Sequence, residues 1–394
     1  MHVLIAPTAF KGTLSASEAA HALAEGWRRV RPNDDLTLIP VGDGGDGSLD
    51  MLCAAVGAVR HTSPACDALG RVRDAPYAIL PDGSAFIETA AVVGIAMLDP
   101  AELDIMRAST AGLGDLISHL LDRGIRRIAI GVGGTASHDV GIGMLAALGV
   151  RFDGVEGDLL GGGDLARIQG IDLSMWSAVW SASMRIGGAK RSRTDIDASD
   201  ALRHGVHFTA ICDVECPVYG PDSAAVRFAP QKGASPEMVR DLNAATAHFA
   251  HIVARDTGLR LNRLKYGGAG GALAAGLHLG LDARLVNGAE WLIRRCRIRR
   301  LIAQADVIVT GEGRFDETSL HGKAAYRLAT IAHALGKPVL LATGILGIDP
   351  NRLADLGFAD YASVQARSSD ARNDVSALGQ RLAGSLAPRS NLSM

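Results

Sequence analysis

The chain alternates short apolar runs with loops rich in glycine and aspartate, and a helical pattern follows most of these loops. Residues 2–6, 35–40 and 127–132 are three of the apolar runs. Short β-type runs that alternate with helical segments of roughly 10–15 residues predict βαβ units and a parallel sheet. The alternation therefore restricts the fold to the α/β class.

The first helix has the clearest boundaries. Ser15 and Glu18 stand at the spacing of a capping box, in which each side chain satisfies a backbone N–H of the other residue. Pro32 ends the pattern, so we predict a helix that extends to about Val30. The residues from 323 to 335 predict another helix near the other end of the chain.

The clean βα pattern occupies both ends of the chain, and the middle is less regular. We therefore predict two α/β domains, one inserted in the other. Residues 1–70 and 286–394 would form a Rossmann-like parallel-sheet domain, and residues 71–285 the inserted domain. We expect the active site in the cleft between the two domains. The last 30 residues are polar and without a clear period, which predicts a frayed tail.

Composition excludes several classes of function. The formal net charge of the 394 residues is -2, which does not indicate a nucleic-acid partner. No apolar run approaches the roughly 20 residues of a membrane span, and the first strand lacks the basic residues of a signal peptide. We expect a cytoplasmic enzyme. The five cysteines do not suggest a disulfide framework.

Ligands of doubly wound sheets bind beyond the carboxyl ends of the strands. Phosphoryl transfer needs backbone N–H groups for phosphate, carboxylates for Mg²⁺ and a cation for the transferred group. The segments of this chain that offer such groups at strand or helix ends are residues 8–16, 42–48, 131–141, 228–235 and 311–323.

Each segment taken alone also has a structural explanation. Lys11 could be a surface lysine in a turn, and residues 42–48 a tight acidic turn. The glycine cluster at 267–276 suits either anion binding or close helix packing. The charges within residues 311–323 are harder to explain by solvation alone.

A dinucleotide-binding alternative comes from residues 131–153. Gly131, Gly133 and Ala136 fit the fingerprint after a strand, and Asp153 lies near the distance expected of a ribose-binding acid. His138 stands against this alternative, because the first turn of that helix should be apolar. No P-loop pattern and no protein-kinase motif set occurs in the chain.

Five of the motifs, in order and with compatible spacing, resemble those of the glycerate kinase family that contains the bacterial glycerate 2-kinases. They are APTAFKGTLSA, GDGGDGS, GGTASHDVG, FAPQKGA and TGEGRFD. The resemblance extends from the first strand to about residue 350. It implies two α/β domains and the phosphorylation of D-glycerate, usually to 2-phosphoglycerate, with ATP and Mg²⁺. A homo-oligomer is left open.

The resemblance indicates which motif positions form the site, and we infer the expected roles of the residues there from their chemistry. Catalytic roles are expected of Lys11, Asp43, Lys232 and Asp316. Cofactor binding is expected of Gly44, Gly45, Gly133, Gly134, Asp139, Arg314 and Lys323, and metal binding of Asp46 and Glu312.

The chain departs from the family pattern at the expected site. Asp46 replaces a glutamate, Val140 replaces a glycine, and Thr8 replaces an aspartate. His138 stands where the family has asparagine. These changes keep three alternatives open: a kinase of another small hydroxy acid, an NAD(P)-dependent oxidoreductase, and a non-catalytic ligand sensor.

Overall fold

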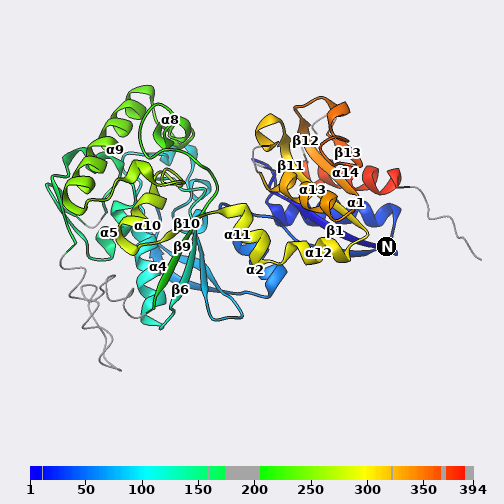
Figure 1. Cartoon of the computed structure of the whole chain (residues 1–394), viewed down its shortest axis with the longest axis horizontal. Helices are drawn as coiled ribbons and strands as arrows, with labels where there is room; N and C mark the ends of the chain where they lie inside the picture. Colours follow the sequence, from blue (N-terminus) through cyan, green and yellow to red (C-terminus); the bar gives the residue numbers. More distant parts are fainter. Residues whose placement is uncertain (11, 158, 174–204, 321–322, 365–369, 387–394) are drawn as a thin grey trace, which may run out of the picture. The chain divides into compact units, whose positions relative to one another are not determined.

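The computed structural model describes residues 1–394 except 11, 158, 174–204, 321–322, 365–369 and 387–394 (Figure 1). The chain forms two compact units. The terminal unit consists of Met1–Asp43, Gly47–Gly57 and Ala289–Met394, and the middle unit of Gly44–Asp46 and Ala58–Gly288.

The terminal unit contains a five-stranded sheet in which every strand is parallel to its neighbours. The strand order is β13-β12-β11-β1-β2. The strands are β1 (His2–Pro7), β2 (Asp35–Leu38), β11 (Val307–Phe315), β12 (Val339–Leu346) and β13 (Asp360–Ser363). The predicted parallel sheet is confirmed, and it combines strands from both ends of the chain. β11 extends through Phe315, where the sequence predicts a loop from residue 311.

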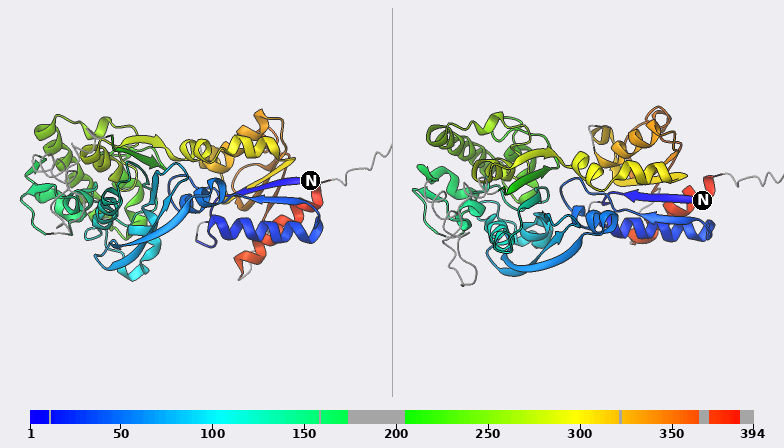
Figure 2. Two further views of the ribbon diagram at one scale, coloured as in Figure 1. Left: turned by 90° about the horizontal axis from the view of Figure 1, so that it is seen from below. Right: turned by 60° about the horizontal axis from the view of Figure 1, so that its bottom comes forward.

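Helices cover both faces of this sheet: α1 (Ala16–Val30) and α14 (Ala371–Ser385) pack together, and α12 (Ile298–Gln304) packs with α13 (Ala324–Ala334). The unit also contains α2 (Ser48–Val56) and most of α11 (Gly288–Arg295). Figure 2 shows β1 with α1 on one side and α12 on the other. The predicted capping box is present, because Ser15 Oγ accepts from the Glu18 N–H and Glu18 accepts from the Ser15 N–H.

The predicted frayed tail is wrong over residues 371–385, which form α14. The Asp370 carboxylate caps this helix by accepting from the N–H groups of Arg372 and Asn373. One face of α14 is buried although most of its other residues are polar. The sequence pattern misses the helix because its stability comes from packing against α1 rather than from its own periodicity.

Two glycines bring α1 and α14 into backbone contact. A Cβ on Gly26 would lie 1.8 Å from the Ser376 carbonyl oxygen, and one on Gly379 would lie 2.2 Å from the Leu23 carbonyl oxygen. Neither position can hold a larger side chain unless the helices separate.

We expect Gly26→Ala to lower the free energy of unfolding by roughly 3 kcal/mol, because the added methyl group overlaps a backbone oxygen. Gly384→Ala in α14 is the matched control. No atom lies within 4 Å of its added Cβ, so it should stabilise by about 0.5–1 kcal/mol. Chemical denaturation of the two variants measures both effects, and equal effects would contradict the packing argument.

The middle unit contains a mixed six-stranded sheet with the order β10-β9-β6-β5-β4-β3. The strands are β3 (Val59–Cys66), β4 (Val72–Ile79), β5 (Ala85–Glu88), β6 (Arg127–Gly131), β9 (His207–Cys212) and β10 (Arg284–Asn287). The pairs among β3, β4 and β5 are antiparallel, and those from β5 to β10 are parallel. β3 therefore places residues 59–66 in the middle unit, whereas the sequence analysis assigns them to the first domain.

The helices of the middle unit are α3 (Ala90–Val93), α4 (Ala111–Asp122), α5 (Ile142–Ala147), α8 (Ala224–Phe228), α9 (Pro236–Thr257) and α10 (Leu273–Leu281). A separate antiparallel pair joins β7 (Arg151–Asp153) to β8 (Gly170–Asp172). Large apolar side chains from the sheet and from α9 fill the core, among them Tyr77, Phe86 and Phe249.

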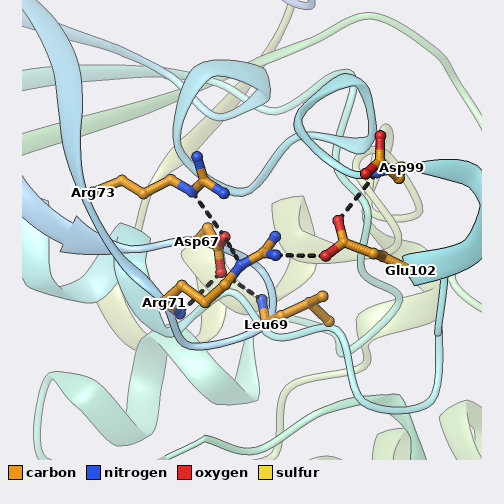
Figure 3. A network of polar contacts seen from close by, with 6 residues as sticks. All are labelled: Asp67, Leu69, Arg71, Arg73, Asp99 and Glu102. Carbon is orange, nitrogen blue, oxygen red and sulfur yellow. Dashed lines mark hydrogen bonds and ion pairs between the residues drawn. The ribbon is translucent and has the colours of Figure 1, made fainter.

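A buried carboxylate organises the turn between β3 and β4 (Figure 3). Asp67 accepts from the Leu69 and Arg71 N–H groups, and from Arg71 Nε at 2.6 Å and Arg73 Nε at 3.0 Å. Burial by itself raises the pKa of Asp67, but these donors outweigh burial and the pKa is lowered. Arg71 Nη1 also donates to Glu102 at 2.6 Å, which ties the turn to the short 3₁₀ helix Pro100–Glu102.

In the part of the chain that the structure describes, no helix combines the length and the apolar character required to cross a bilayer.

Candidate active site

Loops of the middle unit converge at the carboxyl ends of β6 and β9. Gly131 at the end of β6 is in register with Ile211 of β9. The Gly44–Asp46 segment lies against these ends, because the Gly133 N–H donates to the Gly44 carbonyl at 3.0 Å. A Cβ on Gly133 would lie 2.7 Å from Gly45 Cα and 2.8 Å from Asp213 Oδ2. Gly133 therefore allows two loops and a carboxylate to meet.

Lys232 places a buried ammonium group among these loops. The side chain is 5% exposed and comes from the 3₁₀ helix Pro230–Lys232. Its Nζ donates to Ser137 O at 2.6 Å and to Thr135 Oγ1 at 3.0 Å. Burial lowers the pKa of Lys232 to about 8, and the Asp213 carboxylate opposes that shift. Two of the three ammonium protons thus bond to the loop that follows β6.

His138 lies beside this lysine as a neutral imidazole. Burial and the Lys232 charge lower the pKa of His138 to about 3. The Thr246 hydroxyl donates to the Leu242 carbonyl at 2.7 Å, so it must accept from His138 Nε2 at 3.1 Å. The imidazole therefore joins the loop after β6 to α9 and carries its proton on Nε2.

The Asp139 carboxylate, expected to bind the cofactor, is fully buried and has four backbone or side-chain donors. Oδ2 accepts from the Thr110 N–H at 2.8 Å and the Thr110 hydroxyl at 2.6 Å. The N–H groups of Gly141 and Gly143 also donate to this carboxylate. Burial raises the pKa of Asp139, and these hydrogen bonds oppose it. The contacts identify Asp139 as the group that joins the first turns of α4 and α5; a role in cofactor binding stays a prediction.

The glycine cluster at 267–276 packs against the same loop. A Cβ on Gly271 would lie 2.3 Å from the Ser137 carbonyl oxygen, and one on Gly276 would lie 2.1 Å from the Val140 carbonyl oxygen. Of the two explanations that the sequence offers for this cluster, the structure supports close packing. The backbone of the glycine cluster thus packs directly against the loop after β6, whose Ser137 carbonyl accepts from Lys232.

Val140 adopts a left-handed conformation with φ 52° although it is β-branched and buried. Such a residue stores strain of about 1–3 kcal/mol. We expect Val140→Gly to be at least as stable as Val140→Ala, because glycine removes the strain and alanine keeps it. At Val93, a buried position in α3, the order should reverse, since alanine is the better helix former. Thermal denaturation of the four variants checks the order of their melting temperatures. A higher Tm for alanine than for glycine at both positions would show that Val140 is not strained.

The buried charge of Lys232 should make stability depend on pH. Between about pH 8 and its ordinary pKa of 10.5, the folded protein loses this proton while the unfolded chain keeps it. The unfolded chain then binds more protons, so the free energy of unfolding rises with pH in that window. Relative to Lys232→Met, wild type should gain up to about 3 kcal/mol between pH 8 and 10.5. Urea unfolding across this range measures the difference, and a flat difference would show that the lysine titrates normally.

The terminal unit contributes a second group of charged side chains at the end of β11. Glu312 is 7% exposed, and its Oε1 is buried with no hydrogen-bond partner among the described residues. Its Oε2 lies 3.6 Å from Lys323 Nζ. Burial raises the pKa of Glu312, and the Lys323 charge opposes that shift. A buried carboxylate oxygen without a donor is unusual in a folded protein and suits a cation or a proton donor.

Asp316 and Arg314 form an ion pair beyond Glu312. Arg314 Nε donates to Asp316 Oδ2 at 3.0 Å, and the Thr318 N–H and hydroxyl donate to Oδ1. The Thr318 hydroxyl is the largest cause that lowers the pKa of Asp316. Both partners are reachable from solvent, because Arg314 is 60% and Asp316 23% exposed.

The structure groups most of the predicted residues by unit. The middle unit holds Gly44, Gly45, Asp46, Gly133, Gly134, Asp139 and Lys232, and the terminal unit holds Asp43, Glu312, Arg314, Asp316 and Lys323. Lys11 lies outside the described residues. The predicted roles themselves stay predictions.

Sequence reasoning missed three polar groups at the end of the middle sheet. They are Asp213, Thr135 and Ser137. Asp213 follows the apolar run 206–212 directly, which is the same signal that identified Asp43 after the second strand. The two hydroxyl groups carry no comparable signal, because serine and threonine are common in loops.

The dinucleotide alternative does not match the local geometry. α5 begins at Ile142, whereas the fingerprint requires the helix to open at the glycines. Asp153 lies in β7 and pairs with Gly170 in the separate two-stranded sheet. The spacing in the sequence fits the fingerprint, but the turn that binds pyrophosphate is absent from the described loop.

Two α/β units whose strands end in glycine-rich loops with lysine and carboxylate side chains define an enzyme that acts on small anionic molecules. The chain matches the model of the glycerate kinase family over residues 3–387. It is 34% identical to a glycerate kinase from Halalkalibacterium halodurans over 88% of this chain and 86% of that protein. It is 33% identical to the glycerate 2-kinase of Escherichia coli over 89% of this chain and 86% of that protein.

A solved structure also matches this chain over nearly its whole length. The crystal structure of a protein from Salmonella typhimurium LT2, assigned as glycerate kinase 2, matches with a TM-score of 0.73 and 31% identity. The match covers 98% of this chain and 97% of that one. The chain therefore belongs to the glycerate kinase family and is a phosphotransferase that acts on an alcohol group. The oxidoreductase alternative is wrong.

Proposed function

We propose that this protein phosphorylates D-glycerate with ATP and releases 2-phosphoglycerate. The observation that carries the proposal is the buried ammonium group of Lys232 at the ends of parallel strands, in a member of this family. A desolvated cation interacts strongly with a carboxylate or phosphate oxygen. The choice of the 2-hydroxyl follows the name of the relative from Escherichia coli, a glycerate 2-kinase.

The described residues contain no cluster of three or more potential metal ligands, and Glu312 offers one carboxylate oxygen that suits a magnesium ion. Its Oε1 is a buried oxygen without a donor, and carboxylate oxygens are the ligands that Mg²⁺ prefers. We propose Glu312 and Asp46 as the metal ligands of the two units. Bound Mg²⁺ would offset negative charge on the phosphates of ATP. Asp46 is exposed and lies beside Gly134, so its carboxylate is accessible for such a role.

The other expected residues divide into phosphate-binding and proton-accepting groups. We propose that Lys11, Lys232, Arg314 and Lys323 bind anionic oxygens of the two substrates. The glycines Gly44, Gly45, Gly133 and Gly134 would let the backbone approach ATP. Asp43, with Asp316 as the second candidate, would accept the proton of the substrate hydroxyl as phosphoryl transfer proceeds. That these groups meet in one cleft between the two domains stays a prediction.

The first test is turnover. We expect ADP release from Mg-ATP with D-glycerate, at a higher kcat/KM than with L-glycerate or other small hydroxy acids. Phosphorus NMR should identify 2-phosphoglycerate as the product. Formation of 3-phosphoglycerate would reject the proposed position of transfer, and preferred turnover of another acid would favour the alternative acceptor.

The second test addresses the metal. Glu312→Gln should lower kcat by about 100-fold or more and raise the Mg²⁺ concentration for half-maximal activity, because an amide oxygen replaces a charged ligand. Glu317→Gln is the matched control: this exposed glutamate of the 3₁₀ helix Glu317–Leu320 pairs with Arg352. The control should retain its activity and its Mg²⁺ dependence. An unchanged Mg²⁺ dependence in Glu312→Gln would remove Glu312 from the metal site.

Two alternatives rest on the departures from the family pattern. The shorter Asp46 and the altered residues His138 and Val140 favour a changed acceptor, since all three lie in the predicted site loops. A ligand sensor would bind ATP or an acid without turnover, and the turnover assay distinguishes it from both kinases.

A further inference from the structure

The hydroxyl oxygen of Ser137 is one of three buried side-chain atoms in the described middle unit that lack a hydrogen-bond partner, with Arg71 Nη2 and Asp213 Oδ1. Ser137 is 0% exposed, and its Oγ has no hydrogen-bond partner among the described residues. A buried hydroxyl that lacks a partner costs free energy in the folded state. Ordinary packing would place alanine at such a position, so the hydroxyl needs an explanation.

The carbonyl group of the same residue binds the buried ammonium. Lys232 Nζ lies 2.6 Å from Ser137 O and 3.0 Å from Thr135 Oγ1. These two acceptors use two of the three ammonium protons. The Asp213 carboxylate acts on the same ammonium group through its charge, and its buried Oδ1 makes no hydrogen bond with the described residues. The Ser137 hydroxyl and the third N–H of Lys232 are thus two donors without a hydrogen bond to a described residue. The two residues are already in contact through the Ser137 carbonyl.

The charged surroundings favour an anionic oxygen as the missing acceptor. The charged and titratable groups that act on Lys232 are the carboxylates Asp213 and Asp139, the Cys216 thiol and the neutral His138 imidazole. Asp139 is already occupied by its donors from α4 and α5. Lys232 is therefore held by two neutral acceptors, and a carboxylate or phosphate oxygen would accept from both remaining donors.

We propose that Ser137 is a ligand-binding residue whose hydroxyl donates, together with Lys232, to one anionic oxygen of a reactant. The proposal rests on the proposed function for the identity of the reactants, which offer a carboxylate on the hydroxy acid and phosphate oxygens on ATP. The unsatisfied hydroxyl is a cost that the ligand-free protein carries and that binding removes.

Ser137→Ala should therefore change stability and binding in opposite directions. Without ligand, the variant should melt about 2–4 °C higher than wild type, because an unsatisfied buried hydroxyl is removed. Its KM should rise about 10-fold or more for one reactant only, because a hydrogen bond to a charged group is lost. A rise in the KM for D-glycerate assigns the oxygen to the carboxylate, and a rise in the KM for ATP assigns it to a phosphate.

The chain offers two matched controls. Ser376 in α14 is also buried, with an Oγ that lacks a partner, so Ser376→Ala should raise the Tm without changing either KM. Ser109 is buried in the middle unit, and its Oγ accepts from the Ala111 N–H at 3.2 Å. Ser109→Ala should lower the Tm, because it removes the acceptor of a buried donor.

Ligand-induced shifts of the Tm give a readout that does not need turnover. Saturating D-glycerate or ADP should raise the Tm of wild type, and one of these shifts should be smaller in Ser137→Ala. If wild type phosphorylates no hydroxy acid and this shift is still reduced only in Ser137→Ala, the proposed function fails and the binding role of Ser137 stands.

Three results would overturn the inference. A higher Tm with both KM values and both ligand shifts unchanged would show a hydroxyl that is simply unsatisfied. A lower Tm with unchanged binding would show that an internal water serves the hydroxyl. Wild type that neither turns over an acid nor responds to either ligand would leave Ser137 without an anion to bind.

Discussion

Close backbone contact made possible by glycine is the constraint on which the middle unit depends. Gly133 meets Gly45 and Asp213, Gly271 meets the carbonyl of Ser137, and Gly276 meets the carbonyl of Val140. A methyl group at any of these positions would force the loops apart by more than the structure can absorb. The loop after β6 is therefore held by backbone on two sides, and it can keep Val140 strained and Lys232 buried.

The contacts of this closely packed loop explain how a lysine is kept charged below pH 8 inside the protein. The ammonium finds a carbonyl and a hydroxyl in place of water, and Asp213 supplies an opposite charge nearby. Such an arrangement costs stability, and buried groups with perturbed pKa values are common at functional sites. The terminal unit also contains a buried titratable group beside an opposite charge, because the Glu312 carboxylate is buried next to Lys323. Each unit thus keeps an ionised or ionisable group in a place that packing alone would not select.

Much of the local structure is predictable from the sequence. The capping box of Ser15 and Glu18 places the start of α1 to the residue, and the apolar runs locate most of the parallel strands. α14 was missed because its buried face is narrow and its stability comes from contact with α1 through Gly26 and Gly379. The sequence pattern predicts the end of β11 before residue 311, because residues 311–315 are glycine-rich and charged. In the structure these residues pair with β12 and continue the strand to Phe315.

The sequence by itself determined the fold class, the family and the set of loops that carry charge, because these depend on periodicity and on short motifs in order. Only the tertiary structure decided which groups the individual side chains contact. The sequence shows Asp139 and Lys232 as two equivalent charged residues in motif loops, whereas the structure places four donors around Asp139 and leaves Lys232 one proton to give. Thr110 lies 29 residues from Asp139, and Thr135 and Ser137 lie 97 and 95 residues from Lys232. No local pattern records which distant group a side chain will meet.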